Sequence, residues 1–191
     1  MDADGLTFAC ATTAEARVAK RAGLQTARVG IRAVNGVPTG SVVSFGLAGA
    51  LHDGLRVGDV LDATRVVDER GETLWQGDPL GIEGARDATV LASHDLVHDA
   101  DERQRLHEAS GADAVDMESG VLARSGRLAG VVRVISDDAR SSIEGVDTTI
   151  HPDGSTDVVG LLRWVATRRG DALRSMKDAV AALRALERSV A

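Results

Sequence analysis

The feature that most constrains the fold is a repeated alternation between short apolar runs and segments with helical spacing. Runs rich in Val, Ala and Leu occur at 6–11, 41–45, 89–93 and 130–135, and helical patterns follow several of them. This alternation is typical of a mostly parallel α/β sheet. The sequence therefore predicts an α/β fold, a single-domain three-layer sandwich over residues 1–191 with a central mixed, mostly parallel sheet.

Further elements are expected between these runs. Strands are predicted at 29–34 and 58–67, the second leading into a hairpin turn at 68–71. Residues 77–87 are interpreted as a loop, and Gly46–Gly49 as a turn that ends a strand. Helices are predicted at 12–22, 101–110, 117–126, 156–167 and 171–189, and the segment 137–154 is too polar and irregular to assign.

Composition favours an intracellular protein with a small-molecule substrate. The net charge of −7 argues against nucleic acid as a partner, because a nucleic-acid binder needs a basic face. The single Cys10 is expected to be a small buried hydrophobe rather than a nucleophile, and one cysteine fits a reducing, cytoplasmic location. We find no signal-peptide pattern and no apolar run near the ~20 residues of a membrane span.

Two acidic residues follow apolar runs about one βα unit apart. Glu118 follows the run that ends at Val115, and Asp137 follows the run that ends at Ile135. Ligands of open α/β sheets bind outside the carboxyl ends of the strands. Either acid alone also fits an ordinary helix cap or first-turn residue. As a pair, they can divide the work of holding a sugar and protonating a leaving group.

A family resemblance covers these acids. The segments Val115-Asp-Met-Glu-Ser119 and Val134-Ile-Ser-Asp137 resemble the two signature segments of the purine nucleoside phosphorylase and nucleosidase superfamily. Residues 45–51 and 55–60 are similar to a third shared block, and the first strand with Glu15 fits a fourth. Together these blocks span nearly the whole chain in the family's order.

The resemblance implies three catalytic roles. Asp137 would protonate the purine N7, for which burial would have to raise its pKa. Glu118 would bind the ribose hydroxyls, and Glu15 would activate the attacking water. Glu15 also has a structural interpretation, because Thr12-x-x-Glu15 is a capping box at a helix start.

The resemblance also implies a set of substrate-binding residues that surround the sugar and the base. These are Met117 beneath the sugar, Ser136 beside Asp137, and the backbone of Ala48 and Gly49. The nucleosidases place a Phe against the purine, where this chain has Val97 or Leu96. His94, His98 and His107 make no convincing metal site, so neither a metal nor a cofactor is expected.

Water is favoured over phosphate as the nucleophile, because the phosphorylases that this chain resembles carry three phosphate ligands that are missing here. Their Gly-Asp-Pro-x-Arg loop is replaced by residues 11–15, their arginine before the glycine-rich segment by Ser44-Phe45, and their hydroxyl residue by Leu47. The expected reaction is hydrolysis of the N-glycosidic bond of an adenine nucleoside.

The chain looks most like the hopanoid-associated branch, whose substrate is adenosylhopane. Its shortness, the run 152–164 and the Arg-, Ala- and Leu-rich tail carry this similarity, and an aliphatic cleft would suit the apolar 5′ group. The alternatives are a methylthioadenosine or adenosylhomocysteine nucleosidase, a purine nucleoside phosphorylase, and a non-catalytic nucleoside-binding protein. A homodimer is expected from the resemblance. The sequence does not identify the 5′ group.

Overall fold

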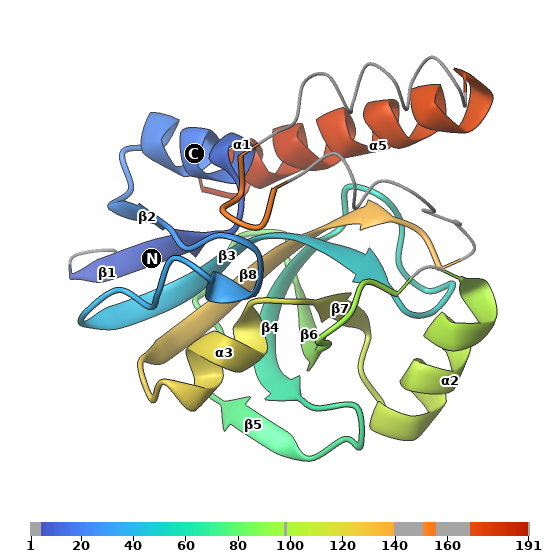
Figure 1. Ribbon diagram of the computed structural model, residues 1–191, viewed down its shortest axis with the longest axis horizontal. Helices are drawn as coiled ribbons and strands as arrows, with labels where there is room; N and C mark the ends of the chain where they lie inside the picture. The colour runs from blue at the N-terminus through green and yellow to red at the C-terminus, as the bar shows by residue number, and fades with distance from the viewer. Residues whose placement is uncertain (1–4, 98, 140–150, 156–168, 191) are drawn as a thin grey trace.

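The computed structural model describes residues 5–97, 99–139, 151–155 and 169–190, and its strands form one eight-stranded sheet (Figure 1). The strands are β1 (Leu6–Cys10), β2 (Thr26–Arg28), β3 (Ser41–Ala50), β4 (Val60–Val67), β5 (Thr73–Gln76), β6 (Arg86–Ala92), β7 (Ala114–Asp116) and β8 (Leu128–Asp137). Their order is β2-β1-β3-β7-β6-β4-β5, and β8 pairs with both β3 and β4. Five of the eight strand pairs are parallel, which confirms a mixed, mostly parallel sheet.

Helices cover both faces of this sheet, which confirms the three-layer arrangement. Helices α1 (Thr13–Arg21) and α5 (Arg169–Arg188) lie together on one face, and α3 (Ser119–Arg124) lies on the other (Figure 1). Under α1 and α5, Phe8 and Phe45 meet edge to face with ring centroids 5.5 Å apart. Helix α2 (Ala100–Ser110) and the 3-10 helix η1 (Ile31–Ala33) complete the described elements.

The pairing of β3 with β8 forms the centre of the sheet. It runs in parallel from Val42 opposite Leu128 to Gly49 opposite Asp137, with a register shift after Ala48. Both strands are nearly continuous apolar runs, as expected for strands that are covered on both faces. This register places the predicted acid Asp137 beside the glycine at the end of β3.

The strand predicted at 29–34 is wrong. Strand β2 ends at Arg28, and η1 occupies half of the predicted range. Gly30 has a φ of 76°, and the N–H of Ile31 donates to the carbonyl of Pro152 at 2.8 Å. The positive φ, which glycine adopts readily, turns the chain away from the sheet.

The turn predicted at Gly46–Gly49 is also wrong, because β3 continues to Ala50. The hairpin at 68–71 is confirmed by the antiparallel pairing of β4 with β5. Strand β6 begins at Arg86, inside the predicted loop. Helix α3 begins at Ser119, two residues later than predicted. The predicted helix 156–167 and the stretch 140–150 lie outside the described residues.

Candidate active site

Glu15 is held through both oxygens of its buried carboxylate. Oε2 accepts hydrogen bonds from the Thr12 N–H at 2.7 Å and from Thr12 Oγ1 at 2.9 Å. Thr12 Oγ1 in turn accepts from the N–H of Glu15, which confirms the capping box at the start of α1. Oε1 reaches across to β3 and accepts from the N–H of Leu47 at 2.9 Å. The same carboxylate therefore caps a helix and faces the sheet, and its catalytic role stays a prediction.

Glu118 lies two residues after the end of β7 and is only 7% exposed. Oε1 accepts from the N–H of Arg32 at 3.1 Å, and Oε2 lies 3.8 Å from Arg133 Nη2. Arg32 has a φ of 54°, a strained conformation for a residue other than glycine. Burial and the charge of Asp116 raise the pKa of Glu118 to about 8, although Arg133 acts in the opposite direction. Glu118 occupies the N-cap position of α3, as the cap interpretation expects, but its side chain makes no capping hydrogen bond there.

Arg133, on β8, is a buried site residue that the sequence analysis missed. Its Nε donates to Asp116 Oδ2 at 2.6 Å, and its Nη2 donates to Ser44 Oγ at 2.6 Å. Burial alone would lower the pKa of Arg133, but Asp116, Glu118 and Glu15 outweigh that effect and raise it. The signal was an arginine in the middle of an otherwise apolar strand, since a fully buried arginine is rare without an acidic partner.

Gly46 brings Glu15 and Arg133 to the same place on β3. A Cβ at this position would overlap Glu15 Oε1 and would lie 2.8 Å from Arg133 Nη1. Glycine is needed here for close approach, because both side chains fill the space that another residue would occupy. We call Glu15, Asp116, Glu118 and Arg133 the acid–arginine cluster: three buried carboxylates around one guanidinium.

Asp137 lies at the end of β8, and its contacts differ from those of the cluster. Ser136 Oγ lies 2.7 Å from Asp137 Oδ1 and 3.3 Å from the carbonyl oxygen of Ala48, so Ser136 fixes one carboxylate oxygen. Oδ2 pairs with Arg103 Nη2 of α2 at 2.5 Å. The Asp137 side chain is 16% exposed. Asp137 therefore lies next to a cation, Arg103, that the sequence did not predict.

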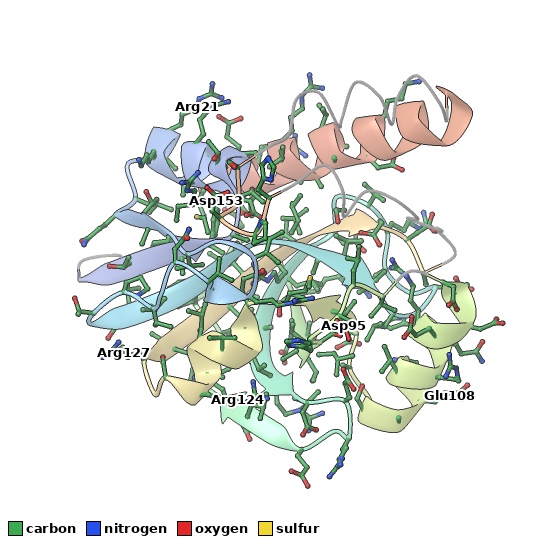
Figure 2. All side chains as sticks on the ribbon, viewed as in Figure 1. Arg21, Asp95, Glu108, Arg124, Arg127 and Asp153 are labelled. Carbon is green, nitrogen blue, oxygen red and sulfur yellow. The ribbon has the colours of Figure 1, made fainter. Side chains whose placement is uncertain are left out.

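Met117 lines a cavity of about 390 Å³ at the carboxyl ends of β6 and β7. Three arginines, Arg32, Arg70 and Arg124, share this lining, and Figure 2 shows Arg124 on α3. His94 also lines the cavity. Asp68 and Glu69 line it too, so the surroundings of Met117 are largely charged rather than aliphatic.

Val97 does not lie in this cavity lining. Its side chain is 4% exposed and packs in the core with Leu51 and Leu91. Its carbonyl oxygen accepts from Arg103 Nη2 at 3.1 Å, which links it to Asp137 through the arginine. In the described part of the chain, no group of three or more His, Cys, Asp or Glu side chains is placed to hold a metal ion.

Cys10 is fully buried on β1, as predicted for a small hydrophobe. Burial, assisted by the nearby charge of Glu15, raises the pKa of its thiol far above the ordinary range. Because the thiolate is the nucleophilic form, Cys10 has no nucleophilic role at physiological pH.

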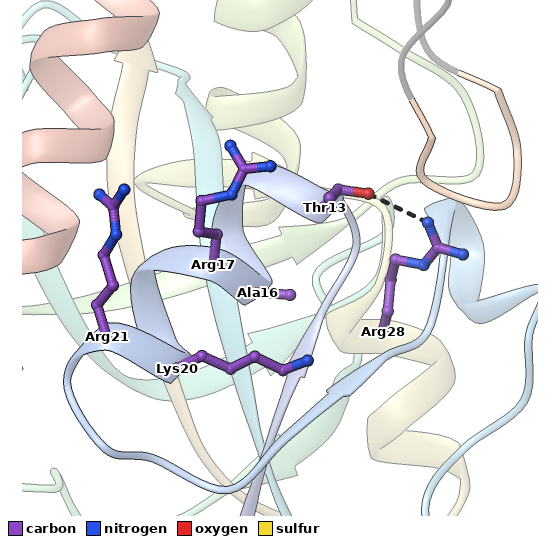
Figure 3. Close-up of a pocket in the computed structure, with 6 residues that line it drawn as sticks. All are labelled: Thr13, Ala16, Arg17, Lys20, Arg21 and Arg28. Atoms are coloured by element: carbon purple, nitrogen blue, oxygen red, sulfur yellow. Dashed lines mark hydrogen bonds between the residues drawn. The ribbon is translucent and has the colours of Figure 1, made fainter.

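A second cavity, of about 450 Å³, lies between α1 and β2 (Figure 3). Its lining includes four cationic side chains: Arg17, Lys20, Arg21 and Arg28. Arg28 Nη1 donates to Thr13 Oγ1 at 3.1 Å. None of the acids described above lines this cavity, so it is separate from the candidate active site.

Comparison with known proteins identifies the architecture. No protein-family model matches the sequence, and no curated protein sequence matches it. Solved structures do match. A 5′-methylthioadenosine/S-adenosylhomocysteine nucleosidase from Helicobacter pylori, in complex with butyl-thio-DADMe-Immucillin-A, matches with a TM-score of 0.57 at 16% identity, covering 97% of each chain. The chain has the fold of the nucleosidases.

Two further structures support this assignment of the fold. Futalosine hydrolase of Helicobacter pylori matches with a TM-score of 0.55 at 15% identity, over 92% of this chain and 96% of that one. The 5′-methylthioadenosine/S-adenosylhomocysteine nucleosidase from S. pneumoniae, with the transition-state inhibitor MT-ImmA, matches with a TM-score of 0.56 at 14% identity. The match covers 95% of this chain and 99% of that one. Among the described residues, none of the helices is both long and apolar enough to span a membrane.

Proposed function

We propose that the protein is a purine nucleosidase that hydrolyses the N-glycosidic bond of an adenine nucleoside without a cofactor. Asp137 protonates the departing base, Glu118 binds the ribose hydroxyls, and Glu15 accepts a proton from the attacking water. Support comes from the positions of the three acids: Asp137 at the end of β8, Glu118 shortly after β7, and Glu15 in the first turn of the helix that follows β1. Support also comes from the fold shared with solved nucleosidases.

The proposed chemistry follows from the charge that develops during glycosidic cleavage. The bond from C1′ to the base nitrogen breaks with its electron pair going to the base, and the sugar becomes oxocarbenium-like. A proton from Asp137 neutralises the departing base. Glu118 in its protonated form can both donate to and accept from the ribose hydroxyls. Water then adds to C1′ while Glu15 takes its proton.

The observation that carries hydrolysis over phosphorolysis is the charge of the acid–arginine cluster. The carboxylates of Asp116 and Glu15 outnumber the single cation Arg133, and Glu118 adds further negative charge only as the pH rises toward about 8 and above. A phosphate dianion would therefore meet a negative environment, whereas water meets none of this repulsion. Leu47 stands where the phosphorylases carry a phosphate-binding hydroxyl residue, and its N–H already donates a hydrogen bond to Glu15.

The finer assignment concerns the 5′ group. The resemblance favours adenosylhopane as the substrate. The charged cavity beside Met117, however, suits a polar 5′ group better than an apolar one. Burying Arg32, Arg70 and Arg124 against hydrocarbon would remove the hydration of their charges. We therefore rank an adenosylhomocysteine-type nucleoside, whose 5′ extension is polar, ahead of adenosylhopane. A homodimer, inferred from the resemblance, is part of the proposal.

A panel of purine nucleosides that differ at the 5′ position tests the proposal, with product masses as the readout. We expect base release from at least one adenine nucleoside, faster when the 5′ group is polar, and a fall of at least 100-fold in Asp137→Asn. Binding of a nucleoside without cleavage would instead support a non-catalytic nucleoside-binding protein. The aliphatic Val97, in place of the Phe expected from the resemblance, favours this alternative. Light scattering after size exclusion measures the oligomeric state.

A further inference from the structure

Arg103 occupies an unusual position for a residue of a polar surface helix. It lies on α2, a helix of mostly polar residues, yet Arg103 is only 1% exposed. Taking a guanidinium out of water is costly unless charge and hydrogen bonds compensate. The contacts of Arg103 show what this arginine holds in place.

Three backbone carbonyls from separate segments fix the guanidinium. Nη1 donates to the carbonyl oxygen of Ala50 at 2.9 Å and to that of Asp138 at 3.4 Å, and Nη2 donates to that of Val97 at 3.1 Å. Nη2 also lies 2.5 Å from Asp137 Oδ2. The planar guanidinium of Arg103 is therefore held by the ends of β3 and β8 and by the loop after β6. It has little freedom to move away from the Asp137 carboxylate.

The adjoining strand leaves room for this pair. A Cβ at Gly49 would lie 2.9 Å from both Arg103 Nη1 and Asp137 Oδ2, so the glycine is required for the contact. Ser136 holds the other carboxylate oxygen at 2.7 Å. The charged group that faces Asp137 from α2 is Arg103, β3 presents only uncharged residues there, and Asp138 follows in the chain.

We propose that Arg103 is a positioning residue that orients the Asp137 carboxylate toward the base and favours its ionised form, so that Asp137 acts as a strong proton donor. The catalytic consequence of this proposal rests on the proposed function, whereas the pairing of Arg103 with Asp137 is observed in the structure.

In each turnover, Asp137 takes one proton from solvent and passes it to a base nitrogen as the glycosidic bond breaks. The carboxylate that remains is stabilised by the adjacent guanidinium, which makes the transfer more favourable. Because a nearby cation favours a charged carboxylate, removing Arg103 should change how the activity depends on pH.

Two variants separate charge from geometry. Arg103→Met removes the cation, whereas Arg103→Lys keeps the charge but loses the planar guanidinium and its several N–H donors. The control is Arg105→Met, because Arg105 is an exposed arginine on the same helix. The readouts are kcat and KM across pH, and the infrared band of the protonated carboxyl that disappears in Asp137→Asn.

For Arg103→Met we expect kcat at acidic pH to fall at least 10-fold with KM within threefold, because the Arg103 guanidinium is engaged by backbone carbonyls and by Asp137. The infrared band should titrate at least one pH unit higher than in the unaltered protein. Arg103→Lys should restore the titration but not the full kcat, and Arg105→Met should change neither. If all Arg103 variants lose activity with an unchanged band titration, Arg103 is only a structural anchor and the proposal is wrong.

The unaltered protein provides a test that does not depend on a variant folding. Asp137 should show no protonated-carboxyl band at pH 7 in the free protein, and its presence would overturn the proposal. The infrared titration needs no turnover. If no nucleoside is cleaved but the band shifts as expected, the proposed function fails while the control of Asp137 by Arg103 stands.

Discussion

Glu118→Gln is expected to stabilise the folded protein at alkaline pH while removing most of its activity. Burial raises the pKa of Glu118 from an ordinary 4.5 to about 8, so folding favours the protonated carboxyl. The stabilising contribution of such a group is complete below about pH 4.5 and is lost as the pH rises through about 8. Glutamine has nearly the same shape and does not ionise, so it removes this loss.

The size of the effect follows from the pKa. A rise from 4.5 to about 8 corresponds to about 5 kcal/mol, at about 1.4 kcal/mol for each pKa unit. About 2 kcal/mol of this is lost by pH 6 and nearly all by pH 9. The stability advantage of the variant should therefore grow by about 3 kcal/mol between these pH values. A changed hydrogen bond to the Arg32 N–H adds only an offset that is independent of pH.

Urea denaturation at pH 6, 7, 8 and 9 measures this difference. The matched control is Glu108→Gln, which alters an exposed acid on α2 whose Oε1 accepts from Gln104 Nε2 (Figure 2). We expect the control to follow the unaltered protein at every pH within about 0.5 kcal/mol. Parallel stability curves for Glu118→Gln and the unaltered protein from pH 6 to 9 would refute the buried-acid reasoning.

Three further outcomes are expected. Gly46→Ala should cost about 1–3 kcal/mol in chemical denaturation and at least 10-fold in kcat, because its Cβ meets Glu15 and Arg133; full activity would show that the two groups can separate freely. Thr12→Val should lower stability by about 1 kcal/mol through loss of the cap and should lower kcat more than it raises KM, whereas unchanged thermal unfolding would contradict the capping box. Cys10 should resist thiol reagents at pH 8 in the folded protein and react in urea, and rapid labelling without denaturant would disprove its burial.

Local patterns were enough to predict much of the fold. Apolar runs predicted the central strands and the mixed sheet, and Thr12-x-x-Glu15 predicted the helix cap. The errors fall where tertiary contacts decide the backbone. Glycines usually signal turns, but Gly46 and Gly49 lie inside strand β3. Glycine is needed at these two positions because side chains from distant segments fill the space that a Cβ would occupy.

The candidate site was predictable only in part, for a similar reason. Glu15, Glu118 and Asp137 each follow a strand, a position that sequence pattern can reveal. The arginines that pair with these acids do not lie at strand ends, and sequence pattern does not reveal their partners. Arg133 lies inside a strand and Arg103 inside a polar helix, and which acid each one meets depends on the packing of β8 and α2.

The most direct test of the central claim is the mass of the sugar product formed in the presence of phosphate. The protein is incubated with a cleaved adenine nucleoside in buffers with and without inorganic phosphate. Our account predicts free adenine and the free sugar in both buffers at similar rates, since the negative charge of the acid–arginine cluster disfavours the phosphate dianion. Formation of the sugar 1-phosphate, or base release only when phosphate is present, would contradict it.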